Sequence, residues 1–372
     1  MYARRNHLGI SLISIGLIYL MTTSLAVAAG GGGVCKRTAH TMELACFADV
    51  EDDFLAANAN CGNFAEPDER KACRREARMI EREETEHCGD VRTARTEACA
   101  LLGEKRYAPD PLLDPANTFI DPDQVPGEYG PNPYVSIAAG HTFVLRAGEE
   151  GEETVVVHVT EDSREIQGVL CRVVTDIVVE VEEENGAVEY IPVEATHDWF
   201  AQDVLGNVYY CGEVARNYED GILRDLDGSF EAGREFAKAG ELIRAYPAAG
   251  DYHRQEYALG EAEDIIQYVD VATAPSADEG GDNPAFPCGP DKCLQTFDFA
   301  PIDPESTEYK YYLPGTGFVL AASMEDGELT GEREELVCIG DSLAILNDPS
   351  CEIEDLDGLL EELCKLDPDA FC

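Results

Sequence analysis

Residues 61–73 read CGNFAEPDERKAC, and Pro67 lies at the midpoint between the two cysteines. Two further cysteine pairs are centred on the same proline, and the successive separations are 11, 15, 12, 15 and 11 residues. Because each residue turns an α-helix by about 100°, steps of 11 and 15 residues return to nearly the same face. We therefore predict an antiparallel helical hairpin over residues 35–103 with the bridges Cys35–Cys99, Cys46–Cys88 and Cys61–Cys73.

The residues around the expected turn favour the same hairpin. Gly62 follows Cys61, where a helix end commonly takes a left-handed residue. Pro67 and the acidic Asp68 suit the first turn of the second helix. The hairpin resembles those of the coiled-coil–helix–coiled-coil–helix family, but its number of cysteine pairs and their spacing differ, so no function is carried over. A hairpin this thin has little core, which makes it a candidate spacer or docking arm.

The first 33 residues, MYARRNHLGISLISIGLIYLMTTSLAVAAGGGG, predict export. Two arginines, an apolar run and the small residues 26–28 have the layout of a secretory signal peptide over residues 1–28. An uncleaved membrane anchor is the alternative. All fourteen cysteines follow this segment, and an even number in an oxidising compartment indicates disulfides. We expect a bacterial protein that is secreted or located in the periplasm or cell envelope.

The chain is strongly acidic. It has 75 Asp and Glu against 27 Lys and Arg, a formal net charge of −48. Such a charge excludes nucleic acid and anionic membrane surfaces as partners. The acidic residues are spread along the whole chain, which favours a solvated surface over a dedicated cation or basic-partner site.

Beyond the hairpin, residues 104–133 form a proline-rich linker that is predicted to be extended and semi-rigid. Residues 134–342 then alternate apolar and polar residues, as in ETVVVHVT (153–160) and NVYYCGEV (207–214). We predict about ten strands in a closed barrel or strongly curved antiparallel sheet, with one helix over residues 231–246. The expected fold class is α+β.

The remaining cysteines are only partly assigned. Cys171 and Cys211 lie in neighbouring strand candidates and are expected to pair, and Cys288 and Cys293 would close a small loop. The tail, residues 343–372, contains an amphipathic helix. With Cys338 it supplies four cysteines that allow three pairings, and the choice stays open at this stage: Cys338, Cys351, Cys364 and Cys372.

The sequence shows no catalytic motif. It contains no GxSxG, HExxH or P-loop pattern, so we assign no catalytic residue and no cofactor. The histidines of the main domain are scattered, and no cysteine pair has zinc-ligand spacing, so no metal site is assigned.

Five polar residues of the strand candidates remain as a possible ligand site. If the barrel closes with these side chains inward, they would line one cavity. The alternative is an internal salt-bridge network or a solvated face of the sheet. The candidates are Asp198, Gln202, Arg254, Glu256 and Lys310.

About 190 residues of the main domain resemble a family of uncharacterised secreted bacterial β-rich proteins. The resemblance is carried by HDWFAQDVLGNVYYCGE (197–213), GSFEAG (228–233), YHRQEYALGEAED (252–264) and EYKYYLPGTGFVL (308–320). It implies an exported β-rich domain and no activity. The chain departs from the family at Cys211 and in the insertion that contains Cys288 and Cys293.

The sequence thus favours an exported, non-enzymatic binding or surface-interaction protein whose partner is an unknown small molecule or protein. A hydrolase or isomerase that uses Asp198 or Glu256 as acid or base is the first alternative. A structural envelope component without a pocket is the second. The ligand and the oligomeric state do not follow from the sequence.

Overall fold

The computed structural model describes residues 33–127, 130–148, 151–184, 186–325 and 327–372. The signal peptide expected over residues 1–28 lies outside these ranges. Residues 33–372 form one compact unit by their contacts. No helix in the described ranges is both long enough and apolar enough to cross a bilayer.

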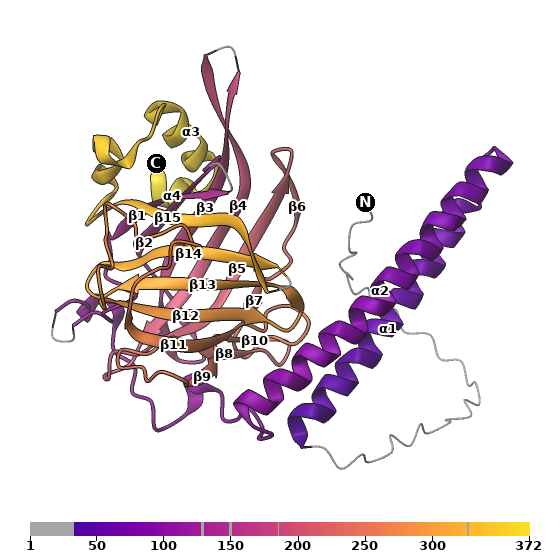
Figure 1. Cartoon of the computed structure of the whole chain (residues 1–372), viewed down its shortest axis with the longest axis horizontal. Coiled ribbons are helices and arrows are strands. Elements are labelled where there is room, and N and C mark those ends of the chain that lie inside the picture. Colours follow the sequence, from indigo (N-terminus) through magenta and orange to yellow (C-terminus); the bar gives the residue numbers. More distant parts are fainter. Residues whose placement is uncertain (1–32, 128–129, 149–150, 185, 326) are drawn as a thin grey trace. The chain divides into compact units, whose positions relative to one another are not determined.

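The N-terminal hairpin consists of α1 (Val34–Cys61) and α2 (Pro67–Leu102), which run side by side in Figure 1. Three disulfides join them with Cα–Cα distances of 5.6, 5.8 and 5.5 Å, in the pairs that the symmetry about Pro67 predicts: Cys35–Cys99, Cys46–Cys88 and Cys61–Cys73. The expectation of a left-handed residue at Gly62 is wrong. Gly62 has a φ of −63°, and its N–H donates to the carbonyl of Ala59, because the last turn of α1 tightens to satisfy its own carbonyls.

The β region is one antiparallel sheet, so the α+β fold class is confirmed. It has fifteen strands in the described residues, more than the ten expected. Two expected segments, 221–230 and 251–259, each divide into two short strands, and the strands at 142–148, 238–243 and 328–340 are not among those expected. Counted along the sheet, the order is β10-β8-β5-β4-β3-β2-β1-β15-β14-β13-β12-β11-β9, and β6 and β7 pair with β5. The bounds are β1 Thr142–Gly148, β2 Glu153–Ile166, β3 Val169–Glu184, β4 Ala187–Gln202, β5 Val208–Glu219, β6 Ile222–Asp225, β7 Phe230–Glu231, β8 Lys238–Ile243, β9 Tyr252–Arg254, β10 Glu256–Tyr257, β11 Ile265–Thr273, β12 Cys293–Ala300, β13 Asp303–Leu313, β14 Gly317–Glu325 and β15 Glu328–Gly340.

One short segment brings the two edges of this sheet together. β9 pairs with β11 at one edge, while β10 pairs with β8 at the other, and only Gln255 separates β9 from β10. Gly240 makes the approach possible, since a Cβ at this position would lie 1.9 Å from the carbonyl oxygen of Gln255. The sheet is therefore nearly closed into a barrel (Figure 1).

The prediction of a helix over residues 231–246 is wrong. Gly233, Glu235 and Phe236 all have positive φ, which interrupts any helix. Lys238–Ile243 forms β8 and pairs with β5. The open edge of β5 offers these residues a ladder of backbone hydrogen bonds, and this tertiary pairing outweighs the helical spacing of the apolar residues.

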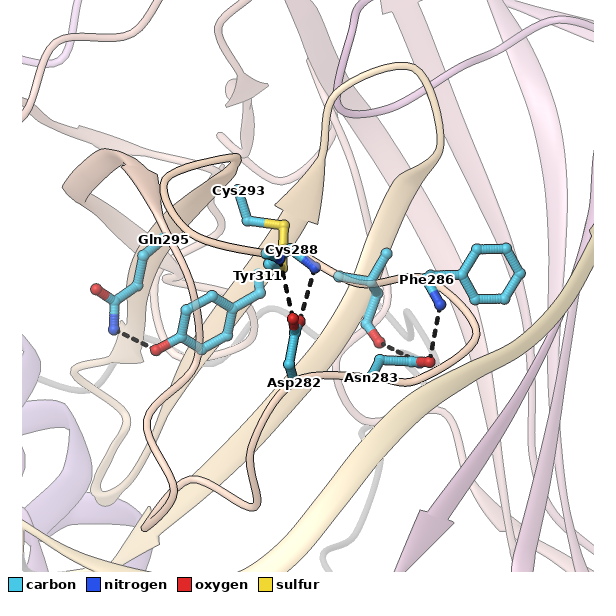
Figure 2. The surroundings of a disulfide bond; sticks show 9 residues. Asp282, Asn283, Phe286, Cys288, Cys293, Gln295 and Tyr311 are labelled. Atoms are coloured by element: carbon cyan, nitrogen blue, oxygen red, sulfur yellow. Dashed lines mark hydrogen bonds between the residues drawn. A yellow bond between two sulfur atoms is a disulfide. The ribbon is translucent and has the colours of Figure 1, made fainter.

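The linker contains two 3₁₀ turns, η1 (Pro111–Leu113) and η2 (Pro122–Gln124), and it packs on the barrel. Leu112 and Ile120 are buried in two of the apolar clusters. The segment between β11 and β12 is fastened in a similar way, as Figure 2 shows. The Cys288–Cys293 bridge closes a loop there, and Asp282 accepts a 2.6 Å hydrogen bond from the N–H of Cys288.

The C-terminal tail covers the outer face of β1–β4. It consists of η3 (Leu343–Asn347), η4 (Pro349–Cys351), α3 (Leu356–Leu366) and α4 (Pro368–Phe371). Leu359 and Leu363 are fully buried against Val156 and Ile177. The structure resolves the open pairings as Cys338–Cys351 and Cys364–Cys372, and it also contains the expected bridge Cys171–Cys211, which links the strands on either side of β4.

Removing the middle bridge of the hairpin should destabilise it selectively. We expect Cys46→Ser combined with Cys88→Ser to lower the free energy of hairpin opening by about 2–4 kcal/mol, because the bridge closes a long chain segment. Hydrogen exchange of the α1 and α2 amides measures this loss.

The matched control is Cys288→Ser combined with Cys293→Ser, which opens a bridge with a sequence separation of only 5 residues, against 42 for the middle bridge. It should leave hairpin exchange unchanged. Unaltered protection of α1 and α2 in the first variant would contradict the stapling role.

Candidate functional site

The inner face of the barrel carries many carboxylates and one close ammonium group. On β12 and β13, Asp298 lies opposite Glu308, and Thr296 lies opposite Lys310. The Lys310 Nζ is 2.8 Å from Glu308 Oε1 and 3.7 Å from Asp298 Oδ2. Ala321 of β14 lies opposite both Lys310 and Glu334, so Glu334 belongs to the same face.

A second group of carboxylates comes from the other wall. Asp198 of β4 lies opposite Glu213 of β5, and its carboxylate accepts a short hydrogen bond from the Tyr210 hydroxyl. Burial raises the pKa of Asp176 on β3, and the charges of Asp198 and Glu334 raise it further. In the sheet order β3 and β15 are separated by β2 and β1, so Asp176 and Glu334 approach across the barrel interior.

We call this group the interior acidic cluster. Its members are linked by mutual electrostatic effects and come from both walls and from the closing segment: Asp176, Asp198, Glu213, Glu256, Asp298, Glu308 and Glu334, with Lys310 among them.

Burial and mutual repulsion hold several of these carboxyls partly protonated near neutral pH. Burial raises the pKa of Asp198 to about 7, and Glu194 adds to it. Burial likewise raises the pKa of Glu334 to about 7 and that of Asp298 to about 6, although Lys310 opposes both shifts. Burial opposes the charge of Lys310, yet Glu308 and Asp298 raise its pKa well above the ordinary value. The interior thus has more acid than its ammonium neutralises.

Some interior polar atoms are left without a hydrogen-bond partner. Asp298 is only 5% exposed, and neither carboxylate oxygen has a partner within hydrogen-bond distance. Thr296 is fully buried, and its hydroxyl is also unpartnered. Buried polar groups in proteins are normally satisfied, so these atoms are available to a ligand or water inside the barrel.

A pocket of about 620 Å³ lies beside the cluster. Glu213 belongs to both, and the pocket walls include Trp199, Arg164 and Phe230. The Arg164 guanidinium stacks on the Trp199 ring at 4.1 Å from its centre. This volume lies within the range of small-molecule sites in proteins.

The structure brings together three of the five candidates from the sequence. Asp198, Glu256 and Lys310 belong to the interior acidic cluster. Gln202 does not, because its side chain donates to the carbonyl of Gly130 and accepts from the N–H of Asn132, which fastens the linker.

Arg254 also lies elsewhere. The candidates are predicted to point into one cavity, but the interruption at Gln255 shifts the alternation between Arg254 and Glu256. Arg254 therefore lines a different pocket, between α2 and the barrel. The sequence reasoning missed the remaining members of the interior acidic cluster. The alternation in LQTFDFA (294–300), which sets Asp298 on the face of Leu294, was the available signal.

Among the described residues, no histidine belongs to the interior acidic cluster. His197 Nε2 lies 2.9 Å from Asp367 Oδ2 and helps to hold the tail on the outer face. Among the described residues, no three His, Cys, Asp or Glu side chains converge closely enough for one metal ion.

Seven disulfides use all fourteen cysteines, which is typical of proteins outside the cytoplasm. The chain is therefore a disulfide-rich, extracytoplasmic α+β protein. Comparison with protein-family models and with curated proteins gives no match.

Two solved structures are similar in part. A predicted exported protein with a YmcC-like fold from Bacteroides fragilis NCTC 9343 has 13% sequence identity and a TM-score of 0.28, with 54% of this chain and 96% of that chain covered. A predicted lipoprotein from Parabacteroides distasonis ATCC 8503 has 11% identity and a TM-score of 0.26, with 54% and 95% covered. TM-scores this low do not establish a shared fold, and no property is inferred from them.

The raised pKa values predict that the protein loses stability as the pH rises. A carboxyl with a folded-state pKa near 7 and an unfolded-state pKa near 4 binds more protons in the folded state between these values. The free energy of unfolding should therefore fall from pH 5 to pH 8, and denaturant titrations at these pH values measure it.

Asp198→Asn should flatten this dependence, because the amide cannot ionise. The control is Asp303→Asn, at an exposed residue at the start of β13. A free energy of unfolding that rises between pH 5 and pH 8 would contradict the interior placement of these acids.

Proposed function

We propose that this is an exported, non-enzymatic binding protein that takes a small organic cation into the barrel interior. The observation that carries the proposal is Asp298, a buried carboxylate whose oxygens have no partner within hydrogen-bond distance. The Lys310 ammonium, at 3.7 Å from Asp298, lies closer to Glu308, at 2.8 Å. A cation with N–H donors would satisfy the Asp298 oxygens and offset the repulsion among the neighbouring acids.

The distribution of the acids favours an elongated cation with more than one amine. The carboxylates come from β3, β4, β5, β10, β12, β13 and β15, so they are spread over the inner face of the barrel and do not meet at one point. An amine chain can make successive ion pairs along such a face, with Thr296 as an additional acceptor.

An acid–base enzyme is the second candidate, because a pKa near 7 and a Tyr210 hydrogen bond suit Asp198 to proton transfer. On the opposite wall, however, burial raises the pKa of Glu334 to about 7 as well, and that of Asp298 to about 6. The shift is therefore shared by much of the interior and does not single out one catalytic group.

Calorimetric titration with spermidine at pH 8 tests the binding proposal. We expect binding that weakens at least about tenfold, or about 1.4 kcal/mol, in Asp298→Asn and in Glu334→Gln. Binding should also weaken from pH 8 to pH 6, because the interior carboxyls take up protons in this range.

The matched control is Glu335→Gln. Glu335 follows Glu334 on β15 but points to the other face, where it pairs with Arg333. It should leave the affinity unchanged. Absence of spermidine binding at pH 8, or equal affinity in the Glu334 and Glu335 variants, would reject the proposal and favour a structural envelope role.

A further inference from the structure

A second pocket, of about 110 Å³, lies where α2 of the hairpin meets the closing segment of the barrel. The joint is made by Arg95 of α2 and Glu263, which are 7% and 1% exposed. Arg95 Nε lies 2.9 Å from Glu263 Oε2, and Arg95 Nη2 donates to the other carboxylate oxygen. This two-point ion pair fixes one wall of the pocket.

Arg254 forms the opposite wall without an anionic partner of its own. Its guanidinium stacks on the Tyr257 ring at 5.2 Å from the ring centre, and its Nη1 is buried without a hydrogen-bond partner. Among the described residues, Glu263 attracts Arg254 most strongly, but its oxygens are occupied by Arg95 and by the N–H of Gly260 at 2.8 Å. Burial lowers the pKa of Arg254 in spite of the attraction of Glu263.

The surroundings of Arg254 are locally basic in a chain of net charge −48. Lys105 and Arg106 line the same pocket. The ammonium of Lys238 lies 5.8 Å from the ring centre of Tyr107 and 5.7 Å from that of Tyr257. Glu263 forms its ion pair with Arg95, so the lining keeps the positive charges of Lys105, Arg106 and Arg254.

We propose that this pocket binds a small oxyanion, a phosphate or carboxylate group, with Arg254 as its main ligand. Its volume of about 110 Å³ is well below the roughly 300–1,000 Å³ of sites for drug-sized ligands, which suits one such group and not a large molecule. The planar guanidinium offers two parallel donors to an oxyanion, and the oxyanion would supply the partner that Arg254 Nη1 lacks. The site is separate from the interior acidic cluster and does not depend on the proposed cation binding.

Titration of the full chain with inorganic phosphate and with acetate, at constant ionic strength against chloride, tests this inference. We expect a dissociation constant in the low millimolar range for at least one anion, and at least about a tenfold loss of affinity in Arg254→Gln. Tighter binding of phosphate would identify a phosphate group as the ligand, and tighter binding of acetate a carboxylate.

Two further variants keep the test decisive. Lys105→Ala combined with Arg106→Ala changes only exposed side chains, so it should fold even if Arg254→Gln does not, and it should weaken binding about threefold. Arg224→Gln, on β6 outside the pocket, should have no effect. Binding of neither anion at about 20 mM, or unchanged affinity in both pocket variants, would overturn the inference.

Discussion

The closing of the sheet by residues 252–257 is the constraint on which the rest of the structure depends. β9 and β10 are both very short, yet they pair with opposite edges of the sheet. The closure leaves no long unpaired edge at this point and encloses the inner face. It also forces side chains from β3, β4, β5, β12, β13 and β15 toward one interior. Without it, the carboxylates of these strands would face open solvent.

Enclosing so many acids is unfavourable in free energy, because desolvation and like-charge repulsion both oppose it. Protonation of some carboxyls and the charge of Lys310 reduce this cost, and the apolar clusters on the other parts of the sheet and the seven disulfides stabilise the fold around it. A polar interior that lowers the free energy of unfolding is typical of a site that is arranged for a ligand. This is the physical basis on which cation binding is favoured over a structural role.

The same closing segment connects the hairpin to the barrel. Glu263 lies just beyond β10 and receives Arg95, while Arg254 at the end of β9 is left to face the joint. The hairpin is therefore fastened by a buried ion pair as well as by the linker. The interruption at Gln255 separates the two kinds of charge, with Glu256 inside the barrel and Arg254 at the joint.

By itself, the sequence determined the helical hairpin and its three bridges, because helical periodicity and cysteine spacing about Pro67 are local properties. It also determined the strand character of most of the β region, because alternation of apolar and polar residues is read along one chain segment. Only the tertiary structure decided that residues 238–243 form a strand and that Arg254 and Glu256, on either side of Gln255, lie in different sites. It also decided that Asp298, Glu334 and Asp198 belong to one cluster. These outcomes depend on which strands pair across long stretches of chain. The free energy of pairing depends on both segments, so it cannot be predicted from the residue pattern of one segment alone.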